Sequence, residues 1–474
     1  MTVLASTPVV LALSAGFVAH AVNGRLVAGD PSRVFATVST DSRALAGHDA
    51  CEHALFIALA GPNFDGHAFV ADLLARNIGG LLVAHPVSVS GTTAIIEVSD
   101  TLAALQRLAN AVRRASGARV VAITGSAGKT TTKEMTADLL AAKYRVFRNQ
   151  GNLNNHIGLP LSLLELRHGA DVAVVELGMN HAGEIRTLVG IAEPNVRVWT
   201  NVGDAHIGHF GSRAAIADAK AEILEGASTS DVLVVNADDS MILSRTAAFP
   251  GRTMTFGEAG SADVRATDVV DRGFDGTAAT VSISGAAHAV RVPLPGRANL
   301  MNALAAMAVA ADAGVAVADM LPRLAAQRPV SRRGEVTTLA NGARLVDDSY
   351  NASPAALLFA LEALAATPAS RRVAMLGEMR ELGDLAATLH VACGRAAAAA
   401  GVDELIVVGG PVADGLAKGA RAAGLAPERI HRFADSAAAA EAALSFVKIN
   451  DLVLVKGSRG TRMDVVADRL KGRA

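Results

Sequence analysis

The segment Ile123-Thr-Gly-Ser-Ala-Gly-Lys-Thr-Thr-Thr132 decides the fold class of this chain. It follows the apolar run Ala118–Thr124, which has the length of a buried strand, and it leads into Lys129–Ala142, which has the pattern of a helix. A glycine-rich turn between a strand and a helix directs backbone N–H groups and the positive end of the helix toward an anion. The segment therefore predicts a phosphate-binding loop in an α/β domain built on a mostly parallel sheet.

The side chains of this loop match the needs of a nucleoside triphosphate. Lys129 carries the charge that neutralises the β- and γ-phosphates, and the hydroxyl of Thr130 is a ligand for Mg²⁺. The loop has a shorter glycine spacing than the general phosphate-binding pattern, which has an additional glycine at the position of Ile123. A glycine-rich turn with an incidental lysine is the alternative interpretation. We expect the phosphates of a nucleotide to contact Gly125, Ser126, Ala127, Gly128, Lys129, Thr130 and Thr131.

Composition and charge exclude several classes of protein. The 474 residues carry 44 Lys+Arg and 45 Asp+Glu, a net charge of −1, which argues against a general nucleic-acid binder. Apolar residues make up 51% of the chain, yet the stretch Val9–Val22 is interrupted and is shorter than the ~20 residues of a membrane span. Cys51 and Cys393 lie too far apart in the sequence for a CxxC zinc site. We expect a soluble cytoplasmic protein with no nucleic-acid partner.

Three zones follow one another along the chain. Residues 1–100 alternate short strand-like runs with a helical stretch, and Thr101–Arg114 predicts a connecting helix. Residues 101–328 continue this alternation, and the Gly-, Thr- and Val-rich piece Arg252–Pro295 predicts short antiparallel strands attached to the parallel sheet. Residues 329–474 predict a second, Rossmann-like α/β unit. The predicted strands include Ala54–Leu59, Gly80–Ala84, Thr93–Val98, Asp171–Glu176, Val196–Asn201, Asp231–Asn236, Arg344–Asp348, Arg372–Gly377, Asp403–Gly409 and Asp451–Lys456.

Three polar residues beyond the loop, Glu176, His206 and Lys220, have roles that their residue types leave open. Glu176 ends a strand at the edge where α/β sheets place ligands, and a carboxylate suits Mg²⁺, whereas a capping or salt-bridging glutamate is the alternative. His206 also follows a strand, although a single histidine is more often structural. Lys220 lies in Asp218-Ala-Lys-Ala-Glu222, where the residue type alone favours a solvated helix lysine.

The loop in its short form resembles that of the Mur ligases and their folylpolyglutamate synthetase relatives, which are ATP-dependent, amide-forming enzymes. Further stretches resemble the same family in order, from about Ser39 to Met463. As an ordered set these motifs are specific, whereas each one alone is weak. They are Asn152-Leu-Asn-Asn155-His-Ile-Gly-Leu-Pro160, Glu176-Leu-Gly-Met-Asn180, Thr200-Asn-Val-Gly-Asp-Ala-His206, Asp347-Asp-Ser-Tyr-Asn-Ala-Ser-Pro354 and Lys456-Gly-Ser-Arg459.

The resemblance implies a catalytic and metal-binding set. It assigns Glu176 and His206 to metal binding together with Thr130. It makes Lys220 the family lysine that carries a carbamate, whose oxygens would serve a second Mg²⁺. Asn155 would face the phosphates and the metal, with turn formation as its alternative. The implied catalytic residues are Lys129, Asn155, His206 and Lys220, and the implied cofactors are ATP and Mg²⁺, with two ions expected.

The resemblance also implies nucleotide contacts outside the loop. Asn299 occupies the family's adenine-side motif, although the usual preceding histidine is Ala298 here. Arg333 corresponds to an arginine that reaches the nucleotide phosphates. The usual glycine before it is Arg332 in this chain, so either arginine fits that role. Asp348 would bind the nucleotide from the hinge between the middle and last domains.

The outer domains are implied to bind the substrates. Thr40-Asp-Ser-Arg43 and Phe64-Asp-Gly-His67 resemble motifs of a uridine-nucleotide-binding first domain, although an Asx turn with a surface arginine explains the former equally well. Arg459 is a candidate carboxylate clamp, with a surface salt bridge as the alternative. The expected substrate contacts are Thr40, Asp41, Ser42, Arg43, Asp65, His67, Tyr350, Asn351, Lys456, Ser458 and Arg459.

The family member that the motifs resemble most joins D-alanyl-D-alanine to UDP-N-acetylmuramoyl-tripeptide. The resemblance implies that ATP phosphorylates the terminal carboxylate of the tripeptide and that the amine of the dipeptide then displaces phosphate, in a monomeric enzyme of peptidoglycan precursor synthesis. One alternative is the family ligase that adds the third amino acid, whose Asp-Asn-Pro-Arg motif this sequence lacks. The other is a P-loop ATPase whose outer domains bind a partner protein.

Overall fold

The computed structural model describes residues 10–45, 47–61, 64–87, 91–149, 151, 153–205 and 207–472. Strands and helices alternate along most of the chain, and the α/β class is confirmed. The chain divides into two compact units. One comprises the residues up to Ala122 with Lys143–Arg197 and Glu225–Asp231, and the other comprises Ile123–Ala142, Val198–Leu224 and the residues from Val232 onward. The predicted domain boundaries after residues 100 and 328 stay predictions.

A sheet in the first unit has the order β2-β9-β8-β5-β4. Parallel pairing joins β4 to β5, β5 to β8 and β8 to β9, and β2 closes the edge in the antiparallel sense. Phe56 and Leu81 from the strands pack with Leu73 from a helix in its buried core. The elements are β2 (Arg25–Ala28), β4 (Thr37–Ser39), β5 (Ala54–Ile57), β8 (Gly80–Val83), β9 (Ala94–Glu97), α1 (Ala15–Ala21), α2 (His48–Glu52) and α3 (Val70–Ala75).

Helix α4 (Thr101–Ser116) confirms the predicted connecting helix. The Asp100 carboxylate accepts hydrogen bonds from the N–H groups of Leu102 and Ala103, at 2.8 and 3.0 Å, and so caps the first turn. The helix ends at Gly117, whose φ of 67° is a left-handed conformation that glycine adopts without strain. Its apolar stripe is buried, as the helical spacing of its leucines predicts.

The central sheet has the order β11-β12-β10-β13-β14-β15-β16-β17-β18. The prediction of antiparallel strands for Arg252–Pro295 is correct for β16, β17 and β18 but wrong for β15, which runs parallel to β14 and β16. The reason is helix α10 (Ser240–Thr246), a crossover that lets the chain return in the same direction. The strands are β10 (Arg119–Thr124), β11 (Val146–Arg148), β12 (Val172–Glu176), β13 (Val196–Trp199), β14 (Val232–Asn236), β15 (Arg252–Gly257), β16 (Val264–Asp271), β17 (Thr277–Ile283) and β18 (Ala286–Val292).

Two helices of the second unit bring the phosphate loop and a distant segment together. Helix α5 (Lys129–Leu140) packs against α11 (Arg297–Asp312). The buried face of α11 is rich in alanine, and small side chains allow two helix backbones to approach closely. This packing places the first turns of α11 beside the start of α5.

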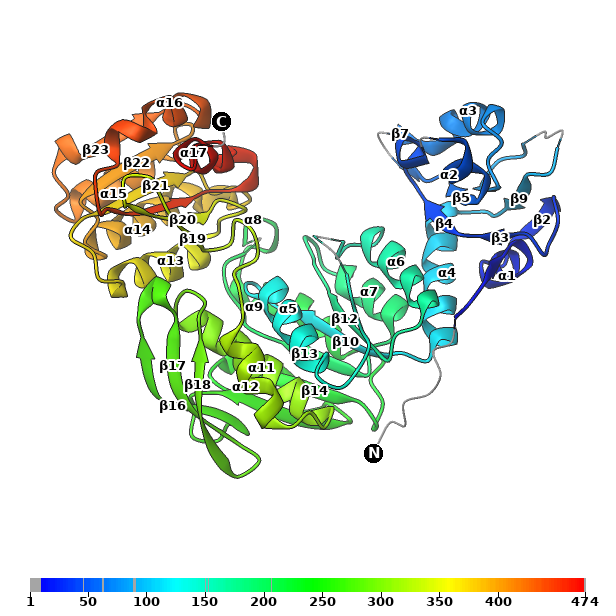
Figure 1. The fold of residues 1–474 in the computed structure, drawn as a ribbon, viewed down its shortest axis with the longest axis horizontal. Helices are drawn as coiled ribbons and strands as arrows, with labels where there is room; N and C mark the ends of the chain where they lie inside the picture. The colour runs from blue at the N-terminus through cyan, green and yellow to red at the C-terminus, as the bar shows by residue number, and fades with distance from the viewer. Residues whose placement is uncertain are drawn as a thin grey trace. The chain divides into compact units, whose positions relative to one another are not determined.

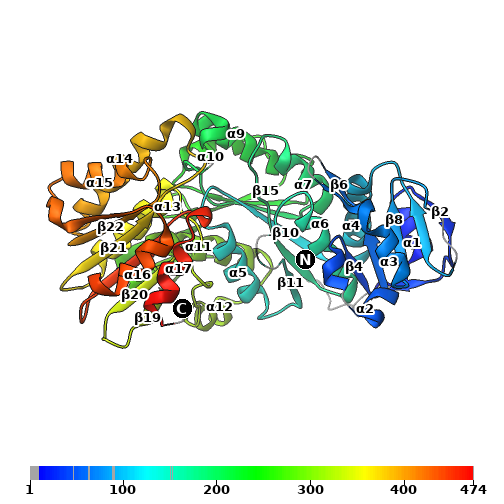
Figure 2. The same cartoon turned by 90° about the horizontal axis from the view of Figure 1, so that it is seen from above.

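The last part of the second unit is built on a sheet in the order β19-β20-β24-β21-β22-β23. Only the β19–β20 pair is antiparallel among the pairs in these described strands, which confirms the Rossmann-like unit. Helices α16 and α17 pack on one face, and α13, α14 and α15 lie on the other (Figures 1 and 2). The elements are β19 (Glu335–Thr338), β20 (Arg344–Asp348), β21 (Arg372–Gly377), β22 (Glu404–Val408), β23 (Ile430–Phe433), β24 (Leu452–Lys456), α13 (Pro354–Ala366), α14 (Ala386–Ala399), α15 (Asp414–Ala422), α16 (Ser436–Phe446) and α17 (Met463–Leu470).

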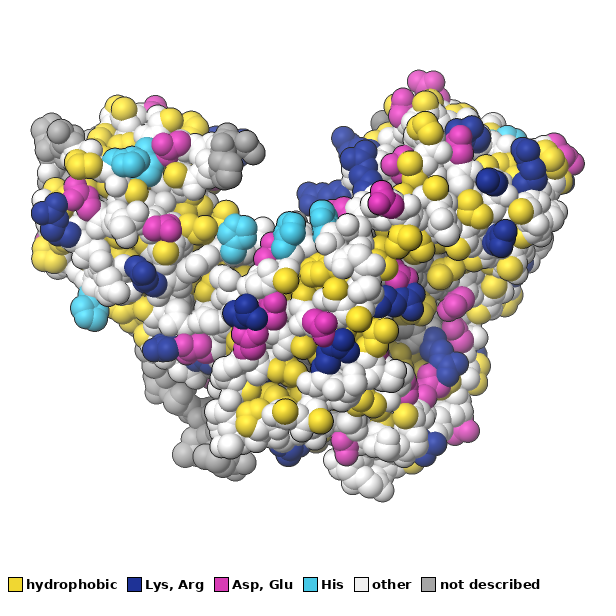
Figure 3. All heavy atoms as spheres, turned by 180° about the vertical axis from the view of Figure 1, so that it is seen from behind, with side chains coloured by type: hydrophobic (Ala, Val, Ile, Leu, Met, Phe, Trp, Pro, Cys, Tyr) yellow, Lys and Arg dark blue, Asp and Glu magenta, His cyan; other side chains and the backbone are white. Residues whose placement is uncertain are grey.

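The surface carries both signs of charge, and both cysteines lie in the interior. Acidic and basic side chains are interspersed over the face drawn in Figure 3. Within the described ranges, no helix combines the length and the apolar character that a bilayer crossing requires. Cys51 and Cys393 are buried and neither forms a disulfide. Burial raises the pKa of the Cys393 thiol to about 12.

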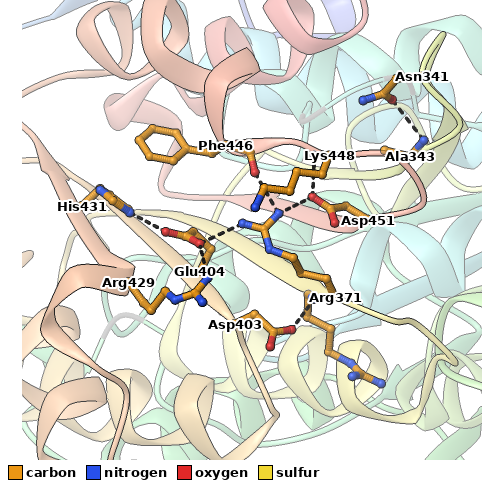
Figure 4. A network of polar contacts seen from close by, with 11 residues as sticks. Asn341, Ala343, Arg371, Asp403, Glu404, Arg429, His431, Phe446, Lys448 and Asp451 are labelled. Carbon is orange, nitrogen blue, oxygen red and sulfur yellow. Dashed lines mark hydrogen bonds and ion pairs between the residues drawn. The ribbon is translucent and has the colours of Figure 1, made fainter.

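A polar network ties together the amino ends of the parallel strands in the last sheet (Figure 4). The Glu404 carboxylate accepts hydrogen bonds from Arg371 at 2.8 Å and Arg429 at 3.3 Å, and it pairs with the His431 ring at 2.5 Å. Arg371 also donates to Asp451 at 2.5 Å. Burial favours the protonated acid, but the hydrogen bonds from His431 and Arg371 outweigh it and hold the pKa of Glu404 below its usual range.

We expect Glu404→Gln to lower the free energy of unfolding by about 1–3 kcal/mol, because Arg371 would lose an anionic partner while staying largely buried. Urea unfolding followed by circular dichroism measures this loss. The carboxylate stabilises the fold above the ordinary glutamate pKa of ~4.3, and this contribution is lost as the pH falls through the lower pKa of the folded state. The difference between the variant and the unmodified protein should therefore shrink as the pH falls below the ordinary glutamate pKa. The exposed Glu428→Gln is the matched control, and an equal loss there would contradict the assignment.

Candidate active site

The loop after β10 is a tight turn into helix α5. Gly128 has a φ of 79°, a left-handed conformation that favours glycine, and the helix begins at the next residue, Lys129. A Cβ atom at position 128 would also collide with the amide oxygen of Asn302. Lys129 Nζ donates a hydrogen bond to the Gly125 carbonyl at 2.9 Å, so its side chain folds back over the loop. The turn places the positive end of the helix dipole where an anion can bind.

The segment that follows β13 holds this loop in place. The Asn201 side chain accepts a hydrogen bond from the Ala127 N–H at 2.9 Å and donates one to the Ala127 carbonyl at 3.0 Å. The Thr200 hydroxyl donates to the same carbonyl at 3.1 Å. The Gly203 N–H donates to the Ser126 hydroxyl at 2.8 Å. Sequence reasoning missed the role of Asn201, because a motif containing this residue says nothing of the partner of its side chain.

These contacts divide the loop into two parts. The N–H groups of Ser126 and Ala127 donate to the backbone and side chain of Asn201, at 3.1 and 2.9 Å. They therefore fasten the middle of the loop to the segment after β13. The first turn of α5, from Lys129 to Thr131, is the part of the loop that carries the helix dipole and the lysine charge, so it is the part best suited to phosphate.

Two asparagines on α11 brace the other side of the loop helix. Asn302 accepts a hydrogen bond from the Thr132 hydroxyl at 3.1 Å and donates one to the Asn299 side chain at 3.0 Å. Asn299 in turn donates to the Pro295 carbonyl at 2.8 Å. The structure thus places Asn299 near the loop helix through Asn302, whereas its contact with adenine stays a prediction.

Lys220, on helix α9 (Arg213–Ala221), is a buried lysine with 2% of its surface exposed. Among the described residues, its ammonium group has no hydrogen bond or ion pair. Burial, reinforced by the positive charge of Lys129, lowers the pKa of Lys220 well below its usual range. The structure therefore overturns the interpretation as a solvated helix lysine, and burial shifts this amine toward its neutral form.

Glu176, in the first unit, is the last residue of β12 and is 4% exposed. Its carboxylate accepts a hydrogen bond from Asn154 Nδ2 at 2.6 Å. The neighbouring Asn155 accepts hydrogen bonds from the N–H groups of Ile157 and Gly158 at 3.2 and 2.8 Å, and so forms the turn that starts helix α6 (Gly158–Leu163). The structure thus brings Asn154 to Glu176, while it gives Asn155 the turn-forming role.

The predicted histidine ligand, His206, lies outside the described residues. Close to it in the chain, the buried Asp204 accepts two hydrogen bonds from Arg213, at 2.5 and 2.6 Å. Arg213 is the first residue of α9, the helix that carries Lys220. This ion pair anchors the start of that helix, and no local pattern in the sequence indicates it.

Predicted nucleotide and substrate residues meet at the carboxyl ends of β20 and β24. Asp348 and Lys456 are register neighbours, and Lys456 Nζ donates to the Asp348 carboxylate at 2.5 Å and to the Asn351 carbonyl at 3.1 Å. The Ser458 hydroxyl donates to the Ala352 carbonyl at 3.2 Å. The loop after β20 is therefore fastened to the loop after β24 by groups that the sequence placed at strand ends.

The adjacent arginines of the linker have different partners. Arg332 forms ion pairs with Asp468 at 2.9 Å and Asp464 at 3.5 Å, both on α17. The guanidinium of Arg333 lies over the ring of Tyr350, 4.2 Å from its centroid. Two carboxylates pair with Arg332, whereas Arg333 forms no ion pair among the described residues, and the phosphate-binding role stays a prediction.

In the first unit, the turn at residues 40–43 is closed by its own side chains. The Asp41 carboxylate accepts hydrogen bonds from the Arg43 N–H at 2.9 Å and from the Arg43 guanidinium at 2.9 and 2.8 Å. These contacts lower the pKa of Asp41 to about 2. This is the Asx turn that the alternative interpretation expected, and it leaves Arg43 exposed to solvent.

Asp65, His67 and His85 bring possible metal-ligand atoms within 4.8 Å of one another. Both ring nitrogens of His67 already have partners, because Nδ1 contacts the Asp65 carboxylate at 2.6 Å and Nε2 accepts a hydrogen bond from the Ala84 N–H at 2.9 Å. His67 thus joins the loop at β7 (Phe64–Asp65) to the end of β8. The contacts favour a structural role for the group.

A phosphate-binding loop between a strand and a helix of an α/β sheet, close to a buried lysine, defines a P-loop enzyme that uses ATP. The family model of the Mur ligase middle domain matches residues 123–310, and that of the Mur ligase glutamate ligase domain matches residues 332–459. The chain belongs to the Mur ligase family, whose members are ATP-dependent ligases.

Curated relatives match nearly the whole chain. The UDP-N-acetylmuramoyl-tripeptide–D-alanyl-D-alanine ligase of Bacillus subtilis is 34% identical over 438 residues, covering 91% of this chain and 92% of that protein. The Escherichia coli ligase of the same name is 36% identical over 454 residues, covering 95% and 96%. MurF from Acinetobacter baumannii has a similar structure, with a TM-score of 0.88, 30% identity and coverage of 98% and 100%. MurF from Thermotoga maritima in complex with ADP gives a TM-score of 0.81, 29% identity and coverage of 92% and 97%.

We expect Asn201→Ala to raise the KM for ATP about tenfold, because the Ala127 N–H and carbonyl would both lose a partner and the loop would lose its fixed shape. Initial rates at varied ATP and calorimetric binding of ADP measure this effect. Asn341→Ala is the matched control, since Asn341 accepts a hydrogen bond from the Ala343 N–H in a turn of the last sheet. An unchanged affinity for both nucleotides in Asn201→Ala would contradict the bracing role.

Proposed function

We propose that this chain joins D-alanyl-D-alanine to UDP-N-acetylmuramoyl-tripeptide, with cleavage of ATP to ADP and phosphate, in peptidoglycan precursor synthesis. The observation that carries the proposal is the extent of the match to relatives of that name, which covers more than nine-tenths of the chain. The match therefore includes the parts that we propose as the UDP-substrate domain (1–100), the ATP domain (101–328) and the dipeptide domain (329–474), and not the ATP loop alone.

The proposed reaction has two steps. An oxygen of the terminal tripeptide carboxylate attacks the γ-phosphorus of ATP, which forms an acyl phosphate and releases ADP. The amine of D-alanyl-D-alanine then attacks the acyl carbon, forms the amide bond, expels inorganic phosphate and loses a proton. The first step brings two anions together, and Lys129 with the start of α5 supplies positive charge on the phosphate side.

We assign metal binding to Thr130, Glu176, His206 and, once carbamylated, Lys220. Hydroxyl and carboxylate oxygens are the ligands that Mg²⁺ prefers, and the burial of Glu176 at a strand end fits such a site. Two Mg²⁺ ions, when bound, would neutralise phosphate charge. Asn155 is proposed to support this region from its turn at α6.

The burial of the Lys220 amine supports the proposed carbamate. A buried lysine without an anionic partner is driven toward the neutral form, which can attack CO₂. The new N–C bond and the loss of a proton leave an anion with two oxygens. Carbamylation would thus replace an unfavourable buried cation with an anion that a divalent metal stabilises.

The remaining predicted residues are proposed as ligand contacts. ATP would meet the loop Gly125–Thr131, including Ser126, Ala127 and Gly128, with Asn299, Arg333 and Asp348 outside it. The UDP substrate would meet Thr40, Asp41, Ser42, Arg43, Asp65 and His67. The dipeptide and the acyl phosphate would meet Tyr350, Asn351, Lys456, Ser458 and Arg459. We propose a monomer that works in the cytoplasm.

An assay of phosphate release tests the reaction. Release should require both the UDP-tripeptide and D-alanyl-D-alanine, because the acyl phosphate needs an amine to complete turnover. Single amino acids, including diaminopimelate with the UDP-dipeptide, should not substitute for the dipeptide. Phosphate release that does not depend on D-alanyl-D-alanine would contradict the proposal and favour a P-loop ATPase. Turnover with a single amino acid would instead favour the family ligase that adds the third amino acid.

Lys220→Ala separates a carbamate from a structural lysine. If Lys220 becomes a metal-binding anion, the variant should lose phosphoryl transfer by orders of magnitude, and short carboxylates such as acetate should partly restore it by filling the cavity. The unmodified enzyme should not respond to acetate, and removal of CO₂ should slow it reversibly. The neighbouring, exposed Asp218→Ala is the matched control on the same helix. Full activity in Lys220→Ala would end the carbamate assignment.

A further inference from the structure

The ring of Tyr350 lies next to two guanidinium groups from separate segments. The Arg333 carbon Cζ is 4.2 Å from the ring centroid, and that of Arg459 is 5.9 Å from it. Both distances lie within the range of about 6 Å in which a cation is attracted to an aromatic ring. Tyr350 is one of only two tyrosines in the chain, and it follows β20 by two residues.

The backbone around Tyr350 joins the same two segments. The Tyr350 N–H donates a hydrogen bond to the Arg332 carbonyl at 3.1 Å, which fixes the linker just before Arg333. The side chain of the next residue, Asn351, accepts a hydrogen bond from the Arg459 N–H at 3.3 Å. The loop after β20 therefore holds the main chain of each arginine segment, while its aromatic ring holds the side chains.

The ring rather than the hydroxyl is the active part of this arrangement. The negative face of an aromatic ring attracts each guanidinium group without neutralising its charge. A carboxylate in the same place would neutralise the arginines, as Asp464 and Asp468 do for Arg332. Among the described residues, the Tyr350 hydroxyl has no hydrogen-bond partner. The arginines thus stay available to anionic ligands.

We propose that Tyr350 is a positioning residue that aligns Arg333 for the phosphates of ATP and Arg459 for the carboxylate of the dipeptide. One ring would then set the orientation of a cation for each of the two substrates. This inference rests on the proposed function, which assigns those two ligands to the two arginines. The proposed role of Tyr350 differs from that of either arginine, because loss of the ring should weaken the binding of both substrates at once.

Single substitutions test the ring. Tyr350→Leu should raise the KM for ATP and the KM for D-alanyl-D-alanine about three- to tenfold each, with a smaller change in kcat. Tyr350→Phe keeps the ring and should restore both KM values to within about twofold of the unmodified enzyme. Tyr350→Met, which has a similar length without an aromatic face, replaces the leucine variant if that variant melts early. Tyr144→Leu is the matched control, since Lys143 lies over the ring of Tyr144 at 5.4 Å.

Double variants show whether Tyr350 acts through the arginines. In an Arg333→Ala background, Tyr350→Leu should no longer change the KM for ATP or the calorimetric affinity for ADP. In an Arg459→Ala background, it should no longer change the KM for D-alanyl-D-alanine. Each pair should therefore be strongly non-additive for one substrate and additive for the other.

Three results would overturn the proposal. If Tyr350→Phe is as impaired as Tyr350→Leu, the hydroxyl and not the ring is responsible. If the effects of Tyr350→Leu and Arg333→Ala on ADP affinity add, the ring does not act through Arg333. If Arg333→Ala by itself leaves nucleotide affinity unchanged, the fault lies in the proposed nucleotide role of that arginine, which distinguishes a failure of the proposed function from a failure of the positioning role.

Discussion

The two hydrogen bonds between the Asn201 side chain and Ala127 are the constraint on which the ATP site depends. A glycine-rich loop has many conformations in isolation, and fixing it costs conformational entropy. Asn201 satisfies both the N–H and the carbonyl of one loop residue, so it holds the loop as a neighbouring strand would. With Asn302 bracing Thr132 from α11, the start of helix α5 is held from two sides. The loop can then present its dipole and Lys129 without rearranging.

Several lysine and arginine side chains of the second unit lie where few or no anionic side chains neutralise them. Lys220 is buried without an anionic partner among the described residues, which is an expensive arrangement unless another group completes it. The guanidinium groups of Arg333 and Arg459 lie by the ring of Tyr350, and Arg333 also interacts electrostatically with the Asp348 carboxylate without forming an ion pair. Lys456 and Arg332, by contrast, are paired with Asp348 and with residues of α17. Among the described residues, the first set forms no ion pair, whereas the second set is held in ion pairs.

In the last sheet, the residues that stabilise the fold and the residues that we assign to ligands lie at opposite ends of the strands. At the amino ends, Glu404 and Asp451 hold Arg371 in a network with short hydrogen bonds. At the carboxyl ends, the loops after β20 and β24 carry the residues that we assign to substrates. Parallel strands make this division possible, because all of their carboxyl ends open onto one edge. A change in the network should therefore alter unfolding more than affinity for ligands.

The local pattern of the chain was enough to predict the α/β class, the phosphate loop and most strand positions. Buried strands and glycine turns are each determined by a few consecutive residues. The local pattern failed for β15, whose direction depends on the crossover helix before it, and for Lys220, whose acidic neighbours indicated a solvated residue. It could not assign the Asp41–Arg43 turn or choose between Arg332 and Arg333. The partners of Asn201, Lys220 and Tyr350 were decided by tertiary structure, because those contacts join residues far apart in sequence and arise only when sheets and helices pack. Short-range periodicity specifies which face of an element is buried, but it does not specify what the buried face meets.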